Sequence, residues 1–226
     1  FHGEYGGPKL INYCLKLIKK NTFEKKTLFI EAFNKCFKLL DSVFKGIVEL
    51  GENKISHQDL SYGNIIINNN KSFIIDFGIS CKFTDLKNIK ERSLKQLRGS
   101  RIYSPYPYDY IYAFATPKEK KKEIEYYQNK LPRNNHGDYL FIHKTFFNRK
   151  NIEYNIFNNL NDTSKTDSSI IIENLDTYSL GIMLPNLFVS FADNYKIDRK
   201  ELAKVFAYKE IQTKMALLKD MTEYDS

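Results

Sequence analysis

The sequence predicts a mainly α-helical chain of the α+β class with one small β-hairpin, and three observations support this fold class. Apolar residues recur at three- and four-residue steps from Phe29 to Val48 and again within 198–221, as on one face of a helix. The stretch 174–191 is apolar almost all round, which predicts a buried helix. Two short apolar runs on either side of an Asn-rich turn, 68–72, predict the hairpin.

The first helix is predicted to be continuous. Its apolar stripe includes Phe29, Phe33, Leu40 and Phe44, and Gly51 is placed to end it.

In the hairpin, Ile65–Ile67 should pair with Phe73–Ile75 across the turn "NNNKS". The polar stretch Lys82–Gly99 that follows is too irregular to predict a helix or strand. The aromatic segment "RIYSPYPYDYIYAF" is spaced around Pro105 and Pro107, which predicts an ordered loop.

The second half of the chain is predicted to be helical at three places. The run Pro117–Glu123, "PKEKKKE", interleaves lysines with acids, a pattern typical of a solvated helix face. In the buried helix, Pro185 should kink or end the helix. The last helix, 198–221, opens with Asp198 three residues before Glu201, a pattern similar to a capping box.

Composition limits the class of protein. The 226 residues are 42% hydrophobic and 27% charged, which suffices for one globular domain or one large lobe. No run of about 18 uncharged apolar residues occurs, and the opening "FHGEYGGPKL" lacks the features of a signal peptide. We therefore expect an intracellular, cytoplasmic protein with no membrane partner. Cys14, Cys36 and Cys81 show no spacing for zinc, which predicts buried thiols rather than disulfides or metal ligands.

The net charge of +8 raises the question of nucleic-acid binding. The densest basic run is the one interleaved with acids at 117–123, so the charge is better explained by a solvated surface. We do not expect nucleic acid as a partner.

An acid, an amide and a second acid, Asp59, Asn64 and Asp76, fall near the ends of the hairpin strands. Oxygen ligands that converge in this way suit Mg²⁺. Each residue taken singly has a structural explanation: a loop cap for Asp59, a turn residue for Asn64 and a strand end for Asp76. Taken together, they predict a magnesium site.

Three motifs, in order along the chain, resemble those of the protein kinases. "HQDLSYGNI" followed by "IIDFG" resembles the catalytic loop H-R-D-L-x-x-x-N and the metal-binding D-F-G, with the same five-residue step from Asp59 to Asn64. "LDTYSLGI" resembles the start of the family's buried central helix. "GEYGG" near the beginning resembles the hinge that links the two kinase lobes. The likeness spans Phe1 to about Leu218.

The resemblance implies that residues 1–226 form a kinase-like carboxyl-terminal lobe. Its parts would be a hinge-like segment at 1–9, the catalytic loop and D-F-G motif at 54–80, an activation segment at 81–110, an insertion at 115–169 and the central buried helix at 174–190. The amino-terminal lobe would lie outside this chain, in the same or another polypeptide, and this chain alone would be inactive.

The family's catalytic roles carry over onto matching positions. Asp59 would accept or orient the proton of the acceptor hydroxyl. Asn64 and Asp76 would hold Mg²⁺ against the phosphates of ATP. His57 and Asp176 are expected to be structural.

The same resemblance implies a set of nucleotide-binding residues. The backbone of Glu4, Tyr5 and Gly6 would hydrogen-bond the edge of the adenine ring, and Ile66 would form the floor beneath it. Ser61 would face the γ-phosphate, where protein kinases usually carry a Lys.

The chain also departs from the kinase pattern. Ser61 in "DLS" is similar to the atypical RIO-type kinases, and Tyr106 or Pro107 stands where the motif G-T-x-x-Y-x-x-P-E has its Glu. Gln58 replaces the Arg that precedes the catalytic Asp. Because a neutral amide cannot pair ionically with a phosphate, we expect activity without phosphorylation of three candidate sites. These sites are Ser93, Ser100 and Tyr103.

Three functions compete on this sequence. The first is a protein kinase that phosphorylates a protein hydroxyl, with Ser or Thr favoured over Tyr; the second is a RIO-like or small-molecule phosphotransferase; the third is a pseudokinase scaffold. "HGDY" at His136–Tyr139 imitates small-molecule kinases, but position 143 is His rather than Asn, so we assign it to a loop. The departures from the kinase pattern resemble those of divergent kinases of large DNA viruses or protists. A viral kinase would lie in a host cytoplasm or a virion.

Overall fold

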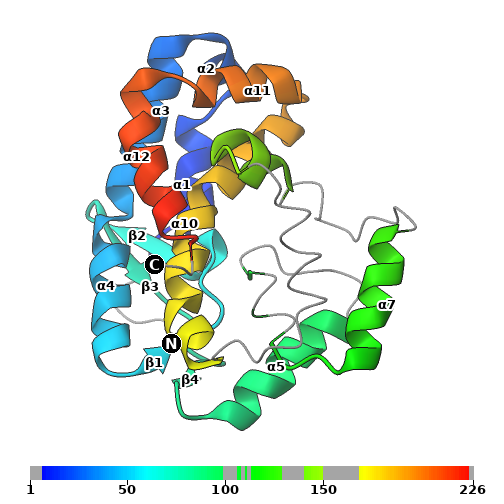
Figure 1. Cartoon of the computed structure of the whole chain (residues 1–226). Coiled ribbons are helices and arrows are strands. Elements are labelled where there is room, and N and C mark those ends of the chain that lie inside the picture. Colours follow the sequence, from blue (N-terminus) through cyan, green and yellow to red (C-terminus); the bar gives the residue numbers. More distant parts are fainter. Residues whose placement is uncertain are drawn as a thin grey trace.

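The computed structural model describes residues 7–98, 106–107, 110, 113–128, 140–149 and 168–223. Within these ranges the chain is mainly helical with two very small β-sheets, which confirms the coarse fold class (Figure 1). The helices are α1 Leu10–Leu17, α2 Lys20–Glu24, α3 Lys26–Leu39, α4 Asp41–Glu52, the 3₁₀ turn η1 Tyr62–Asn64, α5 Leu86–Arg98, α7 Pro117–Gln128, the π-helical turn η2 Ile142–Phe146, α10 Ser168–Asn194, α11 Arg199–Phe206 and α12 Lys209–Asp220.

Each described sheet is an antiparallel pair of strands. β2 (Ile65–Asn68) pairs with β3 (Lys71–Ile74), and β1 (Ile55–Ser56) pairs with β4 (Cys81–Lys82). The hairpin is therefore confirmed, with a shorter turn than the five residues predicted. Asn69 and Asn70 alone form it, with φ of 48° and 59°. A two-residue turn of type I′ requires positive φ at both positions, and Asn tolerates that conformation better than most residues.

The predicted long first helix is two helices, α3 and α4, because the hydrogen-bond ladder breaks at Leu39–Leu40. The Ser72 hydroxyl of β3 donates a hydrogen bond to the carbonyl oxygen of Leu39. The N–H of Leu40 turns back to the carbonyl of Phe37, 2.9 Å away. α4 then extends to Glu52, so Gly51 lies in its last turn rather than beyond its end.

α10 runs through the middle of the molecule, with α3, α4 and α12 on one side and α5 and α7 on the other (Figure 1). Most of its residues from 171 to 192 are buried, as predicted for a central helix. Pro185 was expected to kink or end the helix; it does not end it, because the helix continues to Asn194. Aromatic packing holds this region: the ring of Phe188 lies 5.2 Å from that of Phe29 and 5.7 Å from that of Phe206.

α12 packs closely against α10 at Gly181. A Cβ atom on Gly181 would lie 2.7 Å from the carbonyl oxygen of Leu218 and 2.8 Å from the Cγ2 of Thr222. Only glycine fits there without a shift of α12.

The predicted single helix at 198–221 is two helices, α11 and α12, separated at Ala207–Tyr208. Tyr208 is extended, with ψ of 130°, and the Gln212 side chain donates to the carbonyl of Phe206 at 2.7 Å. The predicted start is confirmed, since the Asp198 carboxylate accepts the N–H of Lys200 at 2.7 Å.

α5 occupies most of the stretch for which no regular element was predicted. It buries Ile89 and Ser93, one helical turn apart, and its start is capped by the carboxylate of Asp85, which accepts the N–H of Asn88 at 3.3 Å. α7 bears out the predicted solvated helix, with Lys118, Lys121 and Lys122 exposed.

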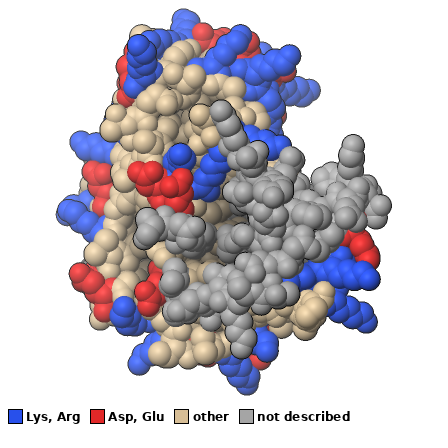
Figure 2. Space-filling view, viewed as in Figure 1, with Lys and Arg blue, Asp and Glu red and all other residues tan. Residues whose placement is uncertain are grey.

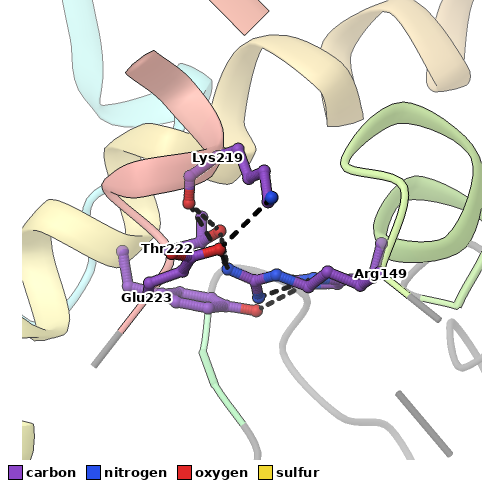
Figure 3. A network of polar contacts seen from close by, with 6 residues as sticks. Arg149, Lys219, Thr222 and Glu223 are labelled. Atoms are coloured by element: carbon purple, nitrogen blue, oxygen red, sulfur yellow. Dashed lines mark hydrogen bonds and ion pairs between the residues drawn. The ribbon is translucent and has the colours of Figure 1, made fainter. Parts of the chain in front are cut away.

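The end of the described chain is fastened by Arg149 (Figure 3). Its Nη2 atom donates to the Thr222 hydroxyl at 3.0 Å and pairs with a Glu223 carboxylate oxygen at 3.3 Å. Its Nη1 atom donates to the Nδ1 of His143 at 3.0 Å. The Nε2 of His143 then donates to the Tyr178 hydroxyl at 3.0 Å. We call His143, Arg149, Tyr178, Thr222 and Glu223 the His143 cluster.

The surface carries both signs of charge. Figure 2 shows basic side chains most densely at the end formed by α2 and α11. Several pair with acids, including Lys204 with Glu201 at 2.6 Å and Lys26 with Glu210 at 2.7 Å. No helix in the described ranges is long and apolar enough to cross a membrane.

The three cysteines are unpaired thiols. Cys14 and Cys36 are fully buried as predicted, with their sulfur atoms 3.3 Å apart, and this contact, together with burial, raises the pKa of Cys36. Cys81 is only half-buried.

Candidate active site

The loop that carries Asp59 is fixed from below by Asp176 of α10. The carboxylate of Asp176 accepts the backbone N–H of His57 at 2.6 Å and that of Gln58 at 3.0 Å. Burial raises the pKa of Asp176, and the two N–H groups oppose that shift. Gln58 adopts a left-handed φ of 61°, which these hydrogen bonds hold in place. The contacts agree with the structural role expected for Asp176.

His57 joins the two halves of the motif through its ring. The N–H of Asp59 donates to Nδ1 at 3.2 Å, so Nε2 carries the proton and donates to the carbonyl of Ile75 at 2.9 Å. The ring of Phe77 packs edge-on at 4.8 Å. His57 therefore ties the backbone of Asp59 to the residue just before Asp76, and its role is structural as expected.

Asp59 and Asn64 are in direct contact. The Asn64 Nδ2 donates to the backbone carbonyl of Asp59 at 2.8 Å and to its carboxylate at 3.0 Å. Both bonds use the amide nitrogen, which leaves the amide oxygen of Asn64 available to a cation. The backbone carbonyl of Asn64 accepts the N–H of Ile75 at 2.9 Å, which brings the start of the D-F-G motif beside it.

Asp76 is exposed and adopts a φ of 65°, a conformation that residues other than glycine adopt infrequently and that is often found at functional sites. A Cβ on Gly78 would lie 3.3 Å from the Oδ1 of Asp76, so the carboxylate lies close to the backbone of Gly78. Within the described residues, no hydrogen bond occupies the carboxylate oxygens of Asp76.

The site fits a magnesium ion only when other ligands complete the set. Among the described residues, no group of three or more His, Cys, Asp or Glu side chains could hold a metal. Asn64 and Asp76 offer two hard oxygens, and Mg²⁺ commonly takes its remaining ligands from phosphate groups and water. The two residues therefore fit Mg²⁺ bound to a nucleotide better than Mg²⁺ alone.

The residues predicted to bind the nucleotide are only partly described. Glu4, Tyr5 and Gly6 lie outside the described residues. Ile66 is 9% exposed and does not belong to the main core that holds Ile65 and Ile67. Its neighbours in β2 point into that core, so Ile66 faces the other side of the strand, as the prediction requires.

The chain that leads into α1 pairs through its backbone with the edge of β2. Pro8 accepts the N–H of Ile67 at 2.9 Å, and Lys9 forms an antiparallel bridge with Ile66. A Cβ on Gly7 would lie 1.8 Å from the carbonyl oxygen of Ile67, so only glycine fits. Ser61 precedes η1 and is half-buried, and its carbonyl accepts the N–H of Asn64 at 2.9 Å.

Of the three candidate phosphorylation sites, Ser93 was a wrong choice. Its side chain is fully buried on α5, where the hydroxyl donates to the carbonyl of Tyr110 at 2.7 Å. A kinase could phosphorylate Ser93 only if this hydrogen bond broke and the side chain became exposed. Ser100 and Tyr103 lie outside the described residues.

Sequence reasoning missed Arg92 as a site residue, because the segment that contains it was not predicted to be helical. Its Nε donates to the hydroxyl of Tyr106 at 2.7 Å, and that hydroxyl donates to the carbonyl of Gln58, beside Asp59. Ile89 and Ser93 stand four residues apart among charged neighbours, a weak helical pattern that could have predicted the helix on which Arg92 lies.

The chain matches no family model, no curated protein and no solved structure. The roles of the site residues therefore rest on motif spacing and on the contacts described above.

Proposed function

We propose that this chain is the carboxyl-terminal catalytic lobe of a protein kinase, which transfers the γ-phosphate of ATP to a protein hydroxyl, with Ser or Thr favoured. The observation that carries the proposal is the direct contact between Asp59 and Asn64, joined to the D-F-G segment through His57. An acid that must face an acceptor hydroxyl and two oxygen donors that must face a metal are thereby held on one short stretch of chain.

The chemistry suits these positions. Phosphoryl transfer depends mainly on holding the acceptor, the phosphates and the metal in line. Asp59 accepts or orients the proton of the acceptor hydroxyl, and Asn64 restrains it with one hydrogen bond to its backbone carbonyl and one to its carboxylate. When bound, Mg²⁺ neutralises charge that develops on the phosphate oxygens. Asn64 and Asp76 would supply its protein ligands.

The other half of the nucleotide cleft would come from an amino-terminal lobe, in the same or another polypeptide. Residues 1–226 alone should therefore bind Mg²⁺-ATP weakly and transfer phosphate at no useful rate. Calorimetric titration of this chain with Mg²⁺-ATP is the first test, and micromolar affinity would refute the expectation of weak binding.

Variants of the complete protein, with the amino-terminal half of the cleft present, can distinguish the role of Asp59 from that of Asp76. Asp76→Asn should abolish transfer through loss of metal and weaken Mg²⁺-nucleotide binding. Asp59→Asn should lower kcat by about 10²–10⁴-fold with nucleotide affinity nearly intact.

The exposed acid Asp220 provides a matched control, because Asp220→Asn makes the same change far along α12 and should alter neither quantity. Equal loss of nucleotide binding in Asp59→Asn and Asp76→Asn would contradict this division of roles. Full activity in both would overturn the proposed function.

A further inference from the structure

A network of buried polar groups converges on Gln58, the residue just before Asp59. The Tyr106 hydroxyl donates to the Gln58 carbonyl and accepts a hydrogen bond from the Nε of Arg92 at 2.7 Å. The Tyr110 hydroxyl lies 3.3 Å from the Oε1 of Gln58, and the Nε2 of Gln58 donates to the sulfur of Cys81. Gln58, Tyr106 and Tyr110 are at most 2% exposed. We call these five residues the Gln58 network.

The contact from Tyr106 has a specific geometric consequence. The carbonyl of Gln58 and the N–H of Asp59 belong to one planar peptide unit. Tyr106 holds the oxygen of that unit, and the Nδ1 of His57 holds its N–H at 3.2 Å. The plane is thus fixed at both edges, and the position of the Asp59 side chain follows from it.

Arg92 strengthens this contact in a way that a neutral donor would not. Burial raises the pKa of Tyr106 to about 12, with Arg92 opposing the shift, so the phenol stays protonated and can donate near neutral pH. The guanidinium that donates to the phenol oxygen polarises the O–H bond, which strengthens its own donation to Gln58. Arg92 also lines a pocket of about 320 Å³ with Lys95 and Cys81, so its charge is only partly removed from water.

We propose that Arg92 and Tyr106 are positioning residues for Asp59, acting through the Gln58–Asp59 peptide. The inference rests on the proposed function for its effect on catalysis. Both residues follow the D-F-G motif in the chain, so the placement of Arg92 and Tyr106 is coupled to Asp59 without a charged residue at position 58.

Tyr106 and Tyr110 provide a matched pair of variants. Their rings pack edge-on with centroids 5.0 Å apart, both are buried and both hydroxyls contact Gln58. Only Tyr106 contacts the peptide unit of Asp59; Tyr110 contacts the Gln58 side chain. Replacement of each by Phe keeps the ring and removes one oxygen, so the two variants differ in which part of Gln58 they release.

The first measurement is steady-state kinetics of the complete protein. Tyr106→Phe should lower kcat by about 10- to 100-fold, because a small misplacement of a catalytic group is costly, while the KM for ATP stays unchanged. Tyr110→Phe should change kcat by less than about threefold, a difference small beside that expected for a misplaced group. Equal losses in the two variants, or a rise in KM alone, would overturn the proposal.

The second measurement does not depend on activity. Hydrogen exchange of the Asp59 amide, followed by NMR on the 226-residue chain, should accelerate in Tyr106→Phe and remain as in wild type in Tyr110→Phe. Accelerated exchange in Tyr106→Phe, found together with no phosphate transfer by the complete wild-type protein, would refute the kinase function and still support the positioning of the peptide. Unchanged exchange in Tyr106→Phe would overturn the positioning itself.

Should Tyr106→Phe fail to fold, Arg92→Met tests the same contact from α5. It leaves the Tyr106 hydroxyl in place and removes only its donor, so kcat should fall by a smaller factor, about 3- to 10-fold, in line with one lost hydrogen bond. Wild-type kcat and exchange in Arg92→Met would contradict a positioning role for Arg92.

Discussion

Two buried histidines each connect two segments of chain, but they do so through different kinds of partner. His57 and His143 each use both ring nitrogens to join two segments of chain. The partners of His57 are backbone groups of Asp59 and Ile75, whereas those of His143 are the side chains of Tyr178 and Arg149. Both partners of His57 lie within the stretch 54–80 that carries the recognised motifs, whereas His143 reaches Tyr178, 35 positions away, and no motif links the two. The first was expected to be structural from the sequence, and the second was not anticipated.

The strongest test of the His57 region is the removal of its support on α10. Asp176→Ala would leave the N–H groups of His57 and Gln58 buried without an acceptor, which should cost about 3–5 kcal/mol of unfolding free energy. Asp176→Asn keeps one oxygen and should cost less. Urea denaturation followed by circular dichroism measures both, and a loss below about 1 kcal/mol in Asp176→Ala would show that the loop is not held by these hydrogen bonds.

A smaller loss is expected in the His143 cluster. Arg149→Met removes the contacts to Thr222 and Glu223 and leaves the Nδ1 of buried His143 without its donor. We expect a loss of about 2–3 kcal/mol by the same measurement, with nucleotide binding unchanged. Lys122→Met on exposed α7 makes the same change of charge and should have little effect. Weakened nucleotide binding in Arg149→Met would erase the contrast between a functional and a purely structural region.

The smallest effect is the contribution of His143 to the dependence of stability on pH. Burial, with a smaller effect from Arg149, lowers the pKa of His143 to about 3. An unfolded chain has a histidine pKa of about 6.5, so below that pH the unfolded state takes up a proton that the folded state does not. The free energy of unfolding should therefore fall as pH drops, by about 2 kcal/mol from pH 7 to pH 5 for this group.

The variant His143→Gln isolates this contribution, since an amide can still bond to Tyr178 and Arg149 but does not titrate. The difference in unfolding free energy between wild type and His143→Gln should shrink as pH falls from 7 to 5. A difference that stays constant over that range would show that His143 is not held neutral in the folded protein.

Features set by neighbours in sequence could be predicted from the sequence. The turn at Asn69–Asn70, the start of α11 at Asp198 and the contact of Asp59 with Asn64 each follow from residues within five positions. The central helix was recognised because an apolar run is informative without knowledge of its partners.

The features that could not be predicted depend on distant residues. The break at Leu39 needs the hydroxyl of Ser72, more than thirty residues away. The contact of Arg92 with Tyr106, and that of Tyr106 with Gln58, likewise join segments whose proximity no local pattern reveals. Propensity alone also allowed the helix to end at Pro185, whereas tertiary packing overrides that tendency in a buried helix.

Pro185 and Gly181 lie one helical turn apart in α10, and together they show where the stability of that helix comes from. Proline has no N–H, so the carbonyl of Gly181 receives no bond from the residue that would normally supply one. Gly181 is also where α12 presses against the helix, with no space even for a methyl group. The helix thus lacks a backbone hydrogen bond at the same position where α12 packs closely against it. The continuity of α10 is accordingly a property of the assembled domain: excised as a peptide, the same residues would form two short, fraying helices.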